Sequence, residues 1–141
     1  MSFFIDANVV LYTAKGDSRG RACREILAAV ARREADGRSS VMALEEVWHL
    51  ELSGRIPGIA GLARRAYDAL EPLLAVSDEA FRLALELPAK RLGANDRLHA
   101  GTCLANGIET IVSADAGFDE LELPRRVDPL DSERLGALLG S

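Results

Sequence analysis

Near the start of the chain lies the stretch Phe3-Phe4-Ile5-Asp6-Ala7-Asn8-Val9-Val10-Leu11, in which an apolar run is followed directly by an acidic residue, Asp6. Its apolar beginning predicts a buried β-strand, and residues 8–13 predict a short helix directly after it. Asp6 therefore stands where the strand ends. Open α/β sheets bind their ligands at the carboxyl ends of the strands, so Asp6 is a candidate site residue. A helix N-cap explains an aspartate at this position equally well.

The composition predicts one globular domain spanning residues 1–141. The chain is 48% hydrophobic, which is enough for a core without disulfides or a structural metal. Cys23 and Cys103 lie in apolar helical patterns without metal-ligand spacing, so we expect reduced thiols in a cytoplasmic protein. No apolar stretch reaches membrane-spanning length, and neither a signal peptide nor a membrane partner is expected. The net charge of -5 argues against a general nucleic-acid coating protein but not against a nuclease, because acidic metal ligands lower the formal charge.

Apolar periodicity predicts strands that alternate with helices. Strands are expected at residues 3–5, 39–42, 73–76 and 108–113, with a short edge strand at Val127. Helices are expected at residues 8–13, 18–36, 43–52, 59–70, 78–88, 96–106 and 132–139. Gly37 is expected to end the second helix, and Leu44, Val47 and Trp48 to form the core face of the third. This order predicts an α/β fold with a mainly parallel central sheet of four to five strands, flanked by helices on both faces.

Further carboxylates recur near the ends of these elements. Asp115 follows the strand predicted at residues 108–113 by two residues, and Asp96 opens the helix predicted at 96–106, where a capping role is the alternative. Glu45 and Glu46 lie early in the third helix, and the geometry of that helix alone does not choose between them. Unpaired carboxylates held close together repel one another, so their gathering at one sheet edge predicts a metal ion.

Three neighbouring side chains are candidates for supporting roles. Asn8 follows Asp6 by two residues, and its amide is suited either to binding a water or to shaping the start of the helix. His99 lies one helical turn after Asp96, where it could orient a site residue, although a structural role explains it as well. Asp119 is either a solvated residue or a peripheral metal ligand.

Four segments, in this order, resemble the PIN-domain family, and in particular the small VapC-type ribonuclease toxins of bacterial toxin–antitoxin modules. The segments are Phe4-Ile5-Asp6-Ala7-Asn8, Ser40-Val41-Met42-Ala43-Leu44-Glu45-Glu46-Val47, Asn95-Asp96-Arg97-Leu98-His99-Ala100 and Thr110-Ile111-Val112-Ser113-Ala114-Asp115-Ala116-Gly117-Phe118. The resemblance spans nearly the whole chain and implies a PIN-like three-layer α/β/α fold. It also implies four catalytic acids that bind Mg²⁺ or Mn²⁺ and activate a water for phosphodiester cleavage: Asp6, Glu46, Asp96 and Asp115.

The resemblance also bears on individual positions. It favours Glu46 over Glu45, because the family's glutamate precedes an apolar residue as Glu46 precedes Val47; Glu45 remains the alternative. Ser113 matches a small hydroxyl residue common near the last acid. The next position, which is often polar or basic in relatives, is Ala114 in this chain.

These patterns predict a metal-dependent endoribonuclease that is the toxin of a toxin–antitoxin pair. The expected partners are an RNA substrate, a cognate antitoxin protein and a second copy of the chain in a homodimer. Arg97, beside Asp96, is a candidate for contact with the RNA backbone, although a solvated surface charge is the alternative. Two other functions use the same fold: a catalytically silent PIN-fold interaction module, and a structure-specific DNA nuclease with the same metal chemistry.

Overall fold

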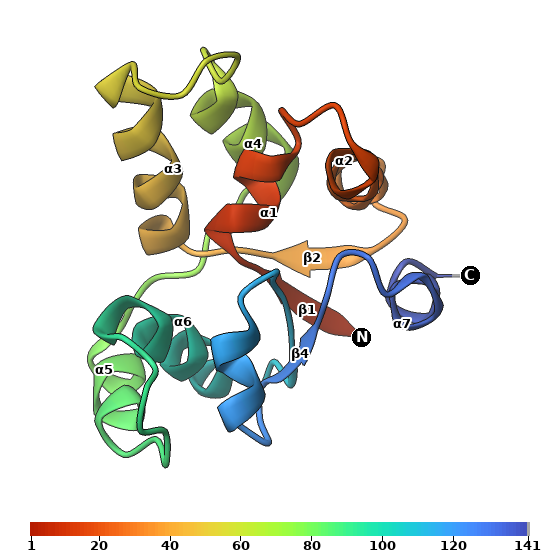
Figure 1. The fold of residues 1–141 in the computed structure, drawn as a ribbon. Helices are drawn as coiled ribbons and strands as arrows, with labels where there is room; N and C mark the ends of the chain where they lie inside the picture. Colours follow the sequence, from red (N-terminus) through yellow and green to blue (C-terminus); the bar gives the residue numbers. More distant parts are fainter. Residues whose placement is uncertain (141) are drawn as a thin grey trace.

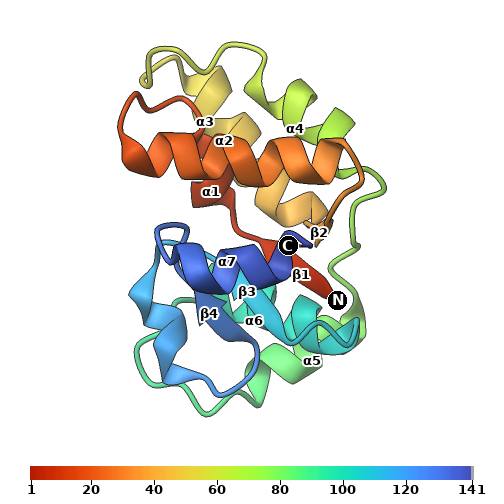
Figure 2. The same ribbon diagram turned by 90° about the vertical axis from the view of Figure 1, so that its right-hand side faces the viewer.

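A single sheet organises the computed structural model, which describes residues 1–140. It has four strands in these residues, in the order β2-β1-β3-β4 (Figure 1; β3 is labelled in Figure 2). The strands are β1 (Ser2–Ile5), β2 (Asp36–Arg38), β3 (Thr110–Val112) and β4 (Arg125–Val127). All neighbouring strands run parallel, so their carboxyl ends lie at one edge. The predicted α/β class with a mainly parallel central sheet is confirmed.

Helices cover both faces of this sheet and make a three-layer α/β/α arrangement. They are α1 (Ala7–Tyr12), α2 (Ser18–Ala31), α3 (Val41–Ser53), α4 (Leu62–Leu70), α5 (Asp78–Leu85), α6 (Ala94–Ala105) and α7 (Ser132–Leu138), with a 3₁₀ helix, η1 (Ala116–Glu120). Figures 1 and 2 show α1 to α4 on one side of the sheet and α5 and α6 on the other.

The central strand β1 connects the two halves of the core. Phe3 and Ile5 pack into the cluster shared with α1, α2 and α4, whereas Phe4 packs with Ile111 and Cys103 into the cluster beneath α6. All five side chains are fully buried. Because successive side chains of a strand point to opposite faces, a strand covered on both sides is hydrophobic throughout, which explains the apolar beginning of the chain.

Cys23 and Cys103 are free and buried, as predicted. Burial raises the pKa of the Cys23 thiol to about 11, so this thiol stays protonated at neutral pH and is a weak nucleophile. Within residues 1–140, the helices lack the length and apolar character needed to cross a bilayer.

Two of the predicted strands are wrong. The segment predicted as a strand at residues 39–42 instead starts α3, because the Ser40 hydroxyl accepts a 3.0 Å hydrogen bond from the Ala43 backbone N–H and caps the helix. The segment predicted at residues 73–76 makes one isolated parallel bridge, from Leu74 to Ser40, in place of a strand. The β-branched and apolar residues in these segments suit a strand, but their tertiary surroundings decide otherwise.

Gly37 was predicted to end a helix, but it is the middle residue of β2. Helix α2 ends earlier, at Ala31. A Cβ atom at Gly37 would lie 2.5 Å from Val30 Cγ2 and 2.9 Å from Ile5 Cδ1. Glycine is therefore needed because β2 passes directly beneath α2, and the side chains of α2 and β1 occupy the space a larger residue would need.

The predicted core face of α3 is only partly correct. Leu44 and Val47 are buried, but 56% of Trp48 is exposed. Trp48 and Tyr67 line an open groove of about 620 Å³ between α3 and α4. Helix α3 therefore carries two apolar stripes, one toward the core and one toward this groove, and sequence periodicity did not separate them.

Candidate metal centre

Asp6 directly follows β1, at the carboxyl edge of the sheet. Its Oδ1 atom accepts a 2.7 Å hydrogen bond from the Ala7 backbone N–H, so Asp6 does cap α1. Its Oδ2 atom accepts hydrogen bonds from Ser113 Oγ at 2.7 Å and from Asn8 Nδ2 at 3.3 Å. Burial raises the pKa of Asp6, although the charge of His99 and the bonds from Ser113 and Ala7 act in the opposite direction. Capping and a site role are therefore compatible in this residue.

Ser113 joins the ends of β1 and β3. Besides donating to Asp6, its buried hydroxyl oxygen accepts hydrogen bonds from Asn8 Nδ2 at 3.1 Å and from the Asp115 backbone N–H at 3.0 Å. The Asn8 side-chain oxygen accepts a 3.3 Å bond from the Ala114 backbone N–H. Ser113 and Asn8 thus hold Asp6 and the backbone of Asp115 in one network, because parallel pairing of β1 and β3 places both strand ends side by side.

Glu46 reaches the same place from α3. Its Oε1 atom lies 3.0 Å from His99 Nε2, and Asp6 Oδ1 lies 3.8 Å from the same nitrogen. Glu45 is exposed and lines the groove between α3 and α4 instead. Of the two glutamates left open by the helix pattern, Glu46 is therefore the one that the fold brings to Asp6.

His99 lies deeper in the protein than its sequence position suggested. Its ring is fully buried and stacks at a tilt on Phe4, with 5.7 Å between the ring centroids. Burial disfavours the charged imidazole, but the hydrogen bond with Glu46 and the charge of Asp6 outweigh this, so the pKa of His99 is raised. The sequence placed His99 near Asp96 on the same helix, but it did not predict the direct contact between His99 and Glu46.

Asp96 and Asp115 complete the acidic cluster from α6 and from the end of β3. Asp96 is the third residue of α6, whose N-cap is Gly93, so the capping alternative for Asp96 is wrong. Burial, the charge of Asp6 and a hydrogen bond with Asp115 raise the pKa of Asp96 to about 7. Asp115 is more exposed and also caps η1 through a 2.8 Å hydrogen bond from the Gly117 backbone N–H. Asp96 therefore keeps its proton to a higher pH than an isolated aspartate does.

Two other candidate residues, Asp119 and Arg97, make their hydrogen bonds outside this cluster. Asp119 pairs with Arg126 through hydrogen bonds of 3.0 and 3.1 Å. Arg97 donates to the backbone carbonyl oxygens of Leu92 at 2.6 Å and Ala89 at 2.8 Å, so it supports the loop before α6.

Sequence patterns did not identify Arg126 as a residue that supports the site. Its guanidinium donates to the Ser113 carbonyl oxygen at 3.1 Å and to Asp128 at 3.0 Å, in addition to Asp119. Arg126 thereby fixes the backbone that carries Ser113. A single arginine in a short edge strand has no local signal that would reveal this role.

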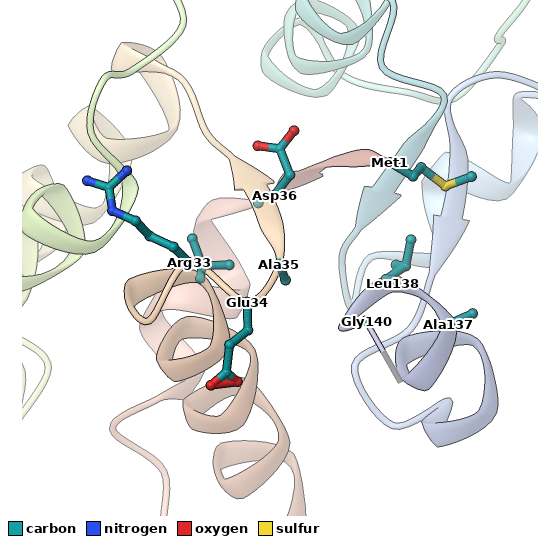
Figure 3. A pocket seen from close by; sticks show the side chains of 10 residues that line it. Met1, Arg33, Glu34, Ala35, Asp36, Ala137, Leu138 and Gly140 are labelled. Carbon is teal, nitrogen blue, oxygen red and sulfur yellow. The ribbon is translucent and has the colours of Figure 1, made fainter.

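A hollow of about 480 Å³ lies at the opposite edge of the sheet, where the strands begin (Figure 3). It lies between α7 and the connection from α2 to β2. Figure 3 shows the charged side chains of Arg33, Glu34 and Asp36 pointing away from one another rather than toward a common point. The acidic cluster is thus separate from this hollow.

The donor set at the carboxyl edge fits a divalent cation. One ligand atom from each of Asp6, Glu46 and His99 lies within 4.8 Å of the others. Asp96 is close enough to Asp6 and Asp115 for their charges to raise its pKa. Mg²⁺ and Mn²⁺ favour carboxylate oxygens, and a cation would relieve the repulsion among these acids.

Comparison with known proteins bears on the fold and on the family of the chain. No curated protein matches the chain. Among solved structures, the chain resembles a chain of VapBC2 from Rickettsia felis, a structure bound to a DNA fragment from the VapBC2 promoter. The TM-score is 0.70 and the identity is 16%, and the match covers 91% of this chain and 98% of that chain. A chain of FitAB bound to an IR36 DNA fragment has a TM-score of 0.67, 16% identity and coverage of 90% and 94%. At these identities the two structures show a shared fold. The family model described as the PIN domain matches residues 3–123, and the chain therefore belongs to the PIN domain family.

Proposed function

We propose that this chain is a metal-dependent endoribonuclease and the toxin of a toxin–antitoxin pair. The observation that carries the proposal is the convergence of Asp6, Glu46, Asp96 and Asp115, from four separate segments, at the carboxyl edge of the sheet. A protein without a cation would keep this arrangement only at an electrostatic cost, since burial and like charge both oppose ionised carboxylates. Intact acids therefore count against a catalytically silent interaction module.

Each residue of the centre has a distinct part in this proposal. Asp6, held by Ser113 and Asn8, offers a carboxylate in a fixed orientation, and Glu46 offers a second one, 3.0 Å from His99 Nε2. Asp96 and Asp115 supply further oxygen ligands. A bound Mg²⁺ or Mn²⁺ would lower the pKa of an attacking water and neutralise negative charge on the leaving oxygen.

The proposed partners rest on family resemblance and on the structural relatives. These relatives come from VapBC2 and FitAB, which were solved with DNA fragments. We propose a cognate antitoxin and a homodimer for this chain in the cytoplasm. Coexpression with the product of an adjacent short reading frame tests the antitoxin: it should restore growth that the chain alone arrests. Unaffected growth on induction of the chain alone would contradict the toxin role.

The catalytic assignment is tested by incubating the purified chain with end-labelled single-stranded RNA and Mn²⁺ or Mg²⁺. We expect internal cleavage that EDTA abolishes, and a loss of about 100-fold or more in Asp6→Asn and Asp96→Asn. Asp68→Asn is a matched control, because Asp68 pairs with Arg64 on the exposed face of α4 and should leave the rate within about twofold. Unchanged cleavage by both folded site variants would refute the assignment. A parallel assay with branched DNA tests the alternative nuclease, which preferential cleavage of that substrate would favour.

A further inference from the structure

His99 occupies a position from which it can contribute a nitrogen to the centre. Its side chain is 1% exposed, and its Nε2 atom lies 3.0 Å from Glu46 Oε1 and 3.8 Å from Asp6 Oδ1. The other ring nitrogen, Nδ1, is buried without a hydrogen-bond partner among residues 1–140. All polar contacts of the ring found in that range therefore point toward the two carboxylates that are best placed to hold a cation.

We infer that His99 is a metal ligand through Nε2, so that the centre is a mixed nitrogen and oxygen site that binds Mn²⁺ in preference to Mg²⁺. The inference rests on the metal site of the proposed function and deepens it. Mn²⁺ prefers oxygen ligands but, as a transition-metal ion, is softer than Mg²⁺ and accepts an imidazole nitrogen more readily, whereas Mg²⁺ takes oxygen ligands and keeps several waters. Four carboxylates alone would serve either ion, so the histidine is the residue that would give the centre a preference.

The environment of the ring also sets the size of that preference. Ligating histidines usually donate their second N–H to a carboxylate, a carbonyl or a water, which fixes the tautomer and strengthens the ligand. The part of the chain that the structure describes offers Nδ1 no such acceptor. We therefore expect a moderate preference, with about a tenfold effect of the His99 nitrogen on the Mn²⁺ dissociation constant.

The competing explanation is that His99 only donates a hydrogen bond to Glu46 and holds it in place. In that arrangement the proton stays on Nε2, and this nitrogen cannot bind a metal. Loss of the imidazole would then weaken the binding of both ions equally, because both would depend on the orientation of Glu46. The two explanations therefore differ in the metal's direct coordination and in selectivity.

Pulsed electron paramagnetic resonance of the Mn²⁺ complex tests the coordination without using activity. The chain contains two histidines, His49 and His99, and His49 is exposed on α3. In a tag-free His49→Leu variant, any imidazole signal must come from His99. We expect a directly coordinated ¹⁴N coupling that changes to the ¹⁵N pattern when the protein is labelled with ¹⁵N-histidine. This design leaves His99 intact, so it does not depend on the folding of a His99 variant.

Calorimetric titration of Mn²⁺ and Mg²⁺ tests the selectivity. We expect His99→Leu to weaken Mn²⁺ binding about tenfold and Mg²⁺ binding much less, with His49→Leu matching the wild type. An Mn²⁺ complex without histidine coupling, equal losses for both ions, or no Mn²⁺ binding at millimolar concentrations would each overturn the inference. RNA cleavage without histidine coupling would leave the nuclease standing and reject His99 as a ligand. Histidine coupling without cleavage of RNA would support the ligand and count against the nuclease.

Discussion

The Ser113 hydroxyl donates a 2.7 Å hydrogen bond to Asp6 Oδ2 although 107 residues separate the two in sequence. The bond exists because β1 and β3 pair in parallel, with Ile5 opposite Val112, so both strands end at the same edge of the sheet. Asp6 therefore does not depend on its own segment alone for its orientation. The first and last acidic segments of the centre are joined through one buried hydroxyl.

Ser113→Ala should destabilise the protein and weaken the centre. The variant removes a donor to a buried carboxylate and an acceptor for Asn8 and the Asp115 backbone N–H, and hydrogen bonds to charged groups contribute about 1.5–3 kcal/mol. Urea denaturation should show a loss in that range. Ser53→Ala is the control, since the exposed Ser53 hydroxyl contacts only nearby backbone: it donates to the Leu50 carbonyl oxygen and accepts from the Arg55 N–H, both of which water can replace. Equal, small losses in both variants would contradict the role of Ser113.

In the metal-free protein, the contribution of the acidic cluster to stability should fall as pH rises from about 4 toward 7. The pKa of Asp96 is about 7 in the folded protein, against about 3.9 in an unfolded chain, so the folded state binds this proton more tightly. The stabilisation is fully present below the unfolded value and is lost as pH passes through the folded one. The raised pKa values of Asp6 and His99 act in the same direction.

Asp96→Asn should therefore flatten this pH dependence. In EDTA, we expect its melting temperature at pH 8 to exceed that of the wild type by about 3 °C or more, with a smaller difference at pH 5. Asp68→Asn, on an exposed face, should follow the wild type. If the melting temperatures of the wild type and Asp96→Asn changed with pH in parallel, ionisation of Asp96 would not destabilise the folded protein.

Glu46 and Glu45 form a matched pair for testing which glutamate belongs to the centre. Glu46 lies 3.0 Å from His99, whereas the adjacent Glu45 lines the groove between α3 and α4. Glu46→Gln should lower RNA cleavage about 100-fold, because it removes a charged ligand without changing side-chain size, and Glu45→Gln should stay within about twofold. Rates measured at saturating Mn²⁺ separate lost catalysis from weaker metal binding. The reverse order of effects would move the ligand to Glu45.

Arg126 and Arg125 make a second matched pair in β4. Arg126 is largely buried and bonds the Ser113 carbonyl oxygen, Asp119 and Asp128, whereas Arg125 is exposed. Arg126→Ala leaves three acceptors without their donor and should cost about 1–3 kcal/mol in the free energy of unfolding. Arg125→Ala should change it by less than about 0.5 kcal/mol. Guanidinium chloride denaturation distinguishes them, and similar values for both would refute the role of Arg126.

The sequence predicted the parts of this protein that depend on local pattern. The apolar run before Asp6 and the strand before Asp115 predicted a parallel sheet with acids at its edge, because strand ends are visible in a single segment. The contact between His99 and Glu46 joins residues 53 positions apart, and no local pattern contains it. Strand β2 was missed for a similar reason, since its sequence Asp36-Gly37-Arg38 has low strand propensity and is ordered by pairing with β1.

The two apolar stripes of α3 place Val47 and Trp48 in different surroundings. Val47 is fully buried, and the adjacent Trp48 is 56% exposed in the groove beside α4. Burial of apolar area sets the cost of truncation, so Val47→Ala should lose about 2 kcal/mol in the free energy of unfolding despite removing few atoms. Trp48→Ala should lose less, because much of the indole stays in contact with water in the folded chain. Urea denaturation followed by far-UV circular dichroism suits both variants, since it does not require the only tryptophan of the chain as a reporter. A larger loss for Trp48→Ala would mean that the groove is closed in solution, either by α4 or by a second copy of the chain. If that loss depended on protein concentration, the second copy would be the cause.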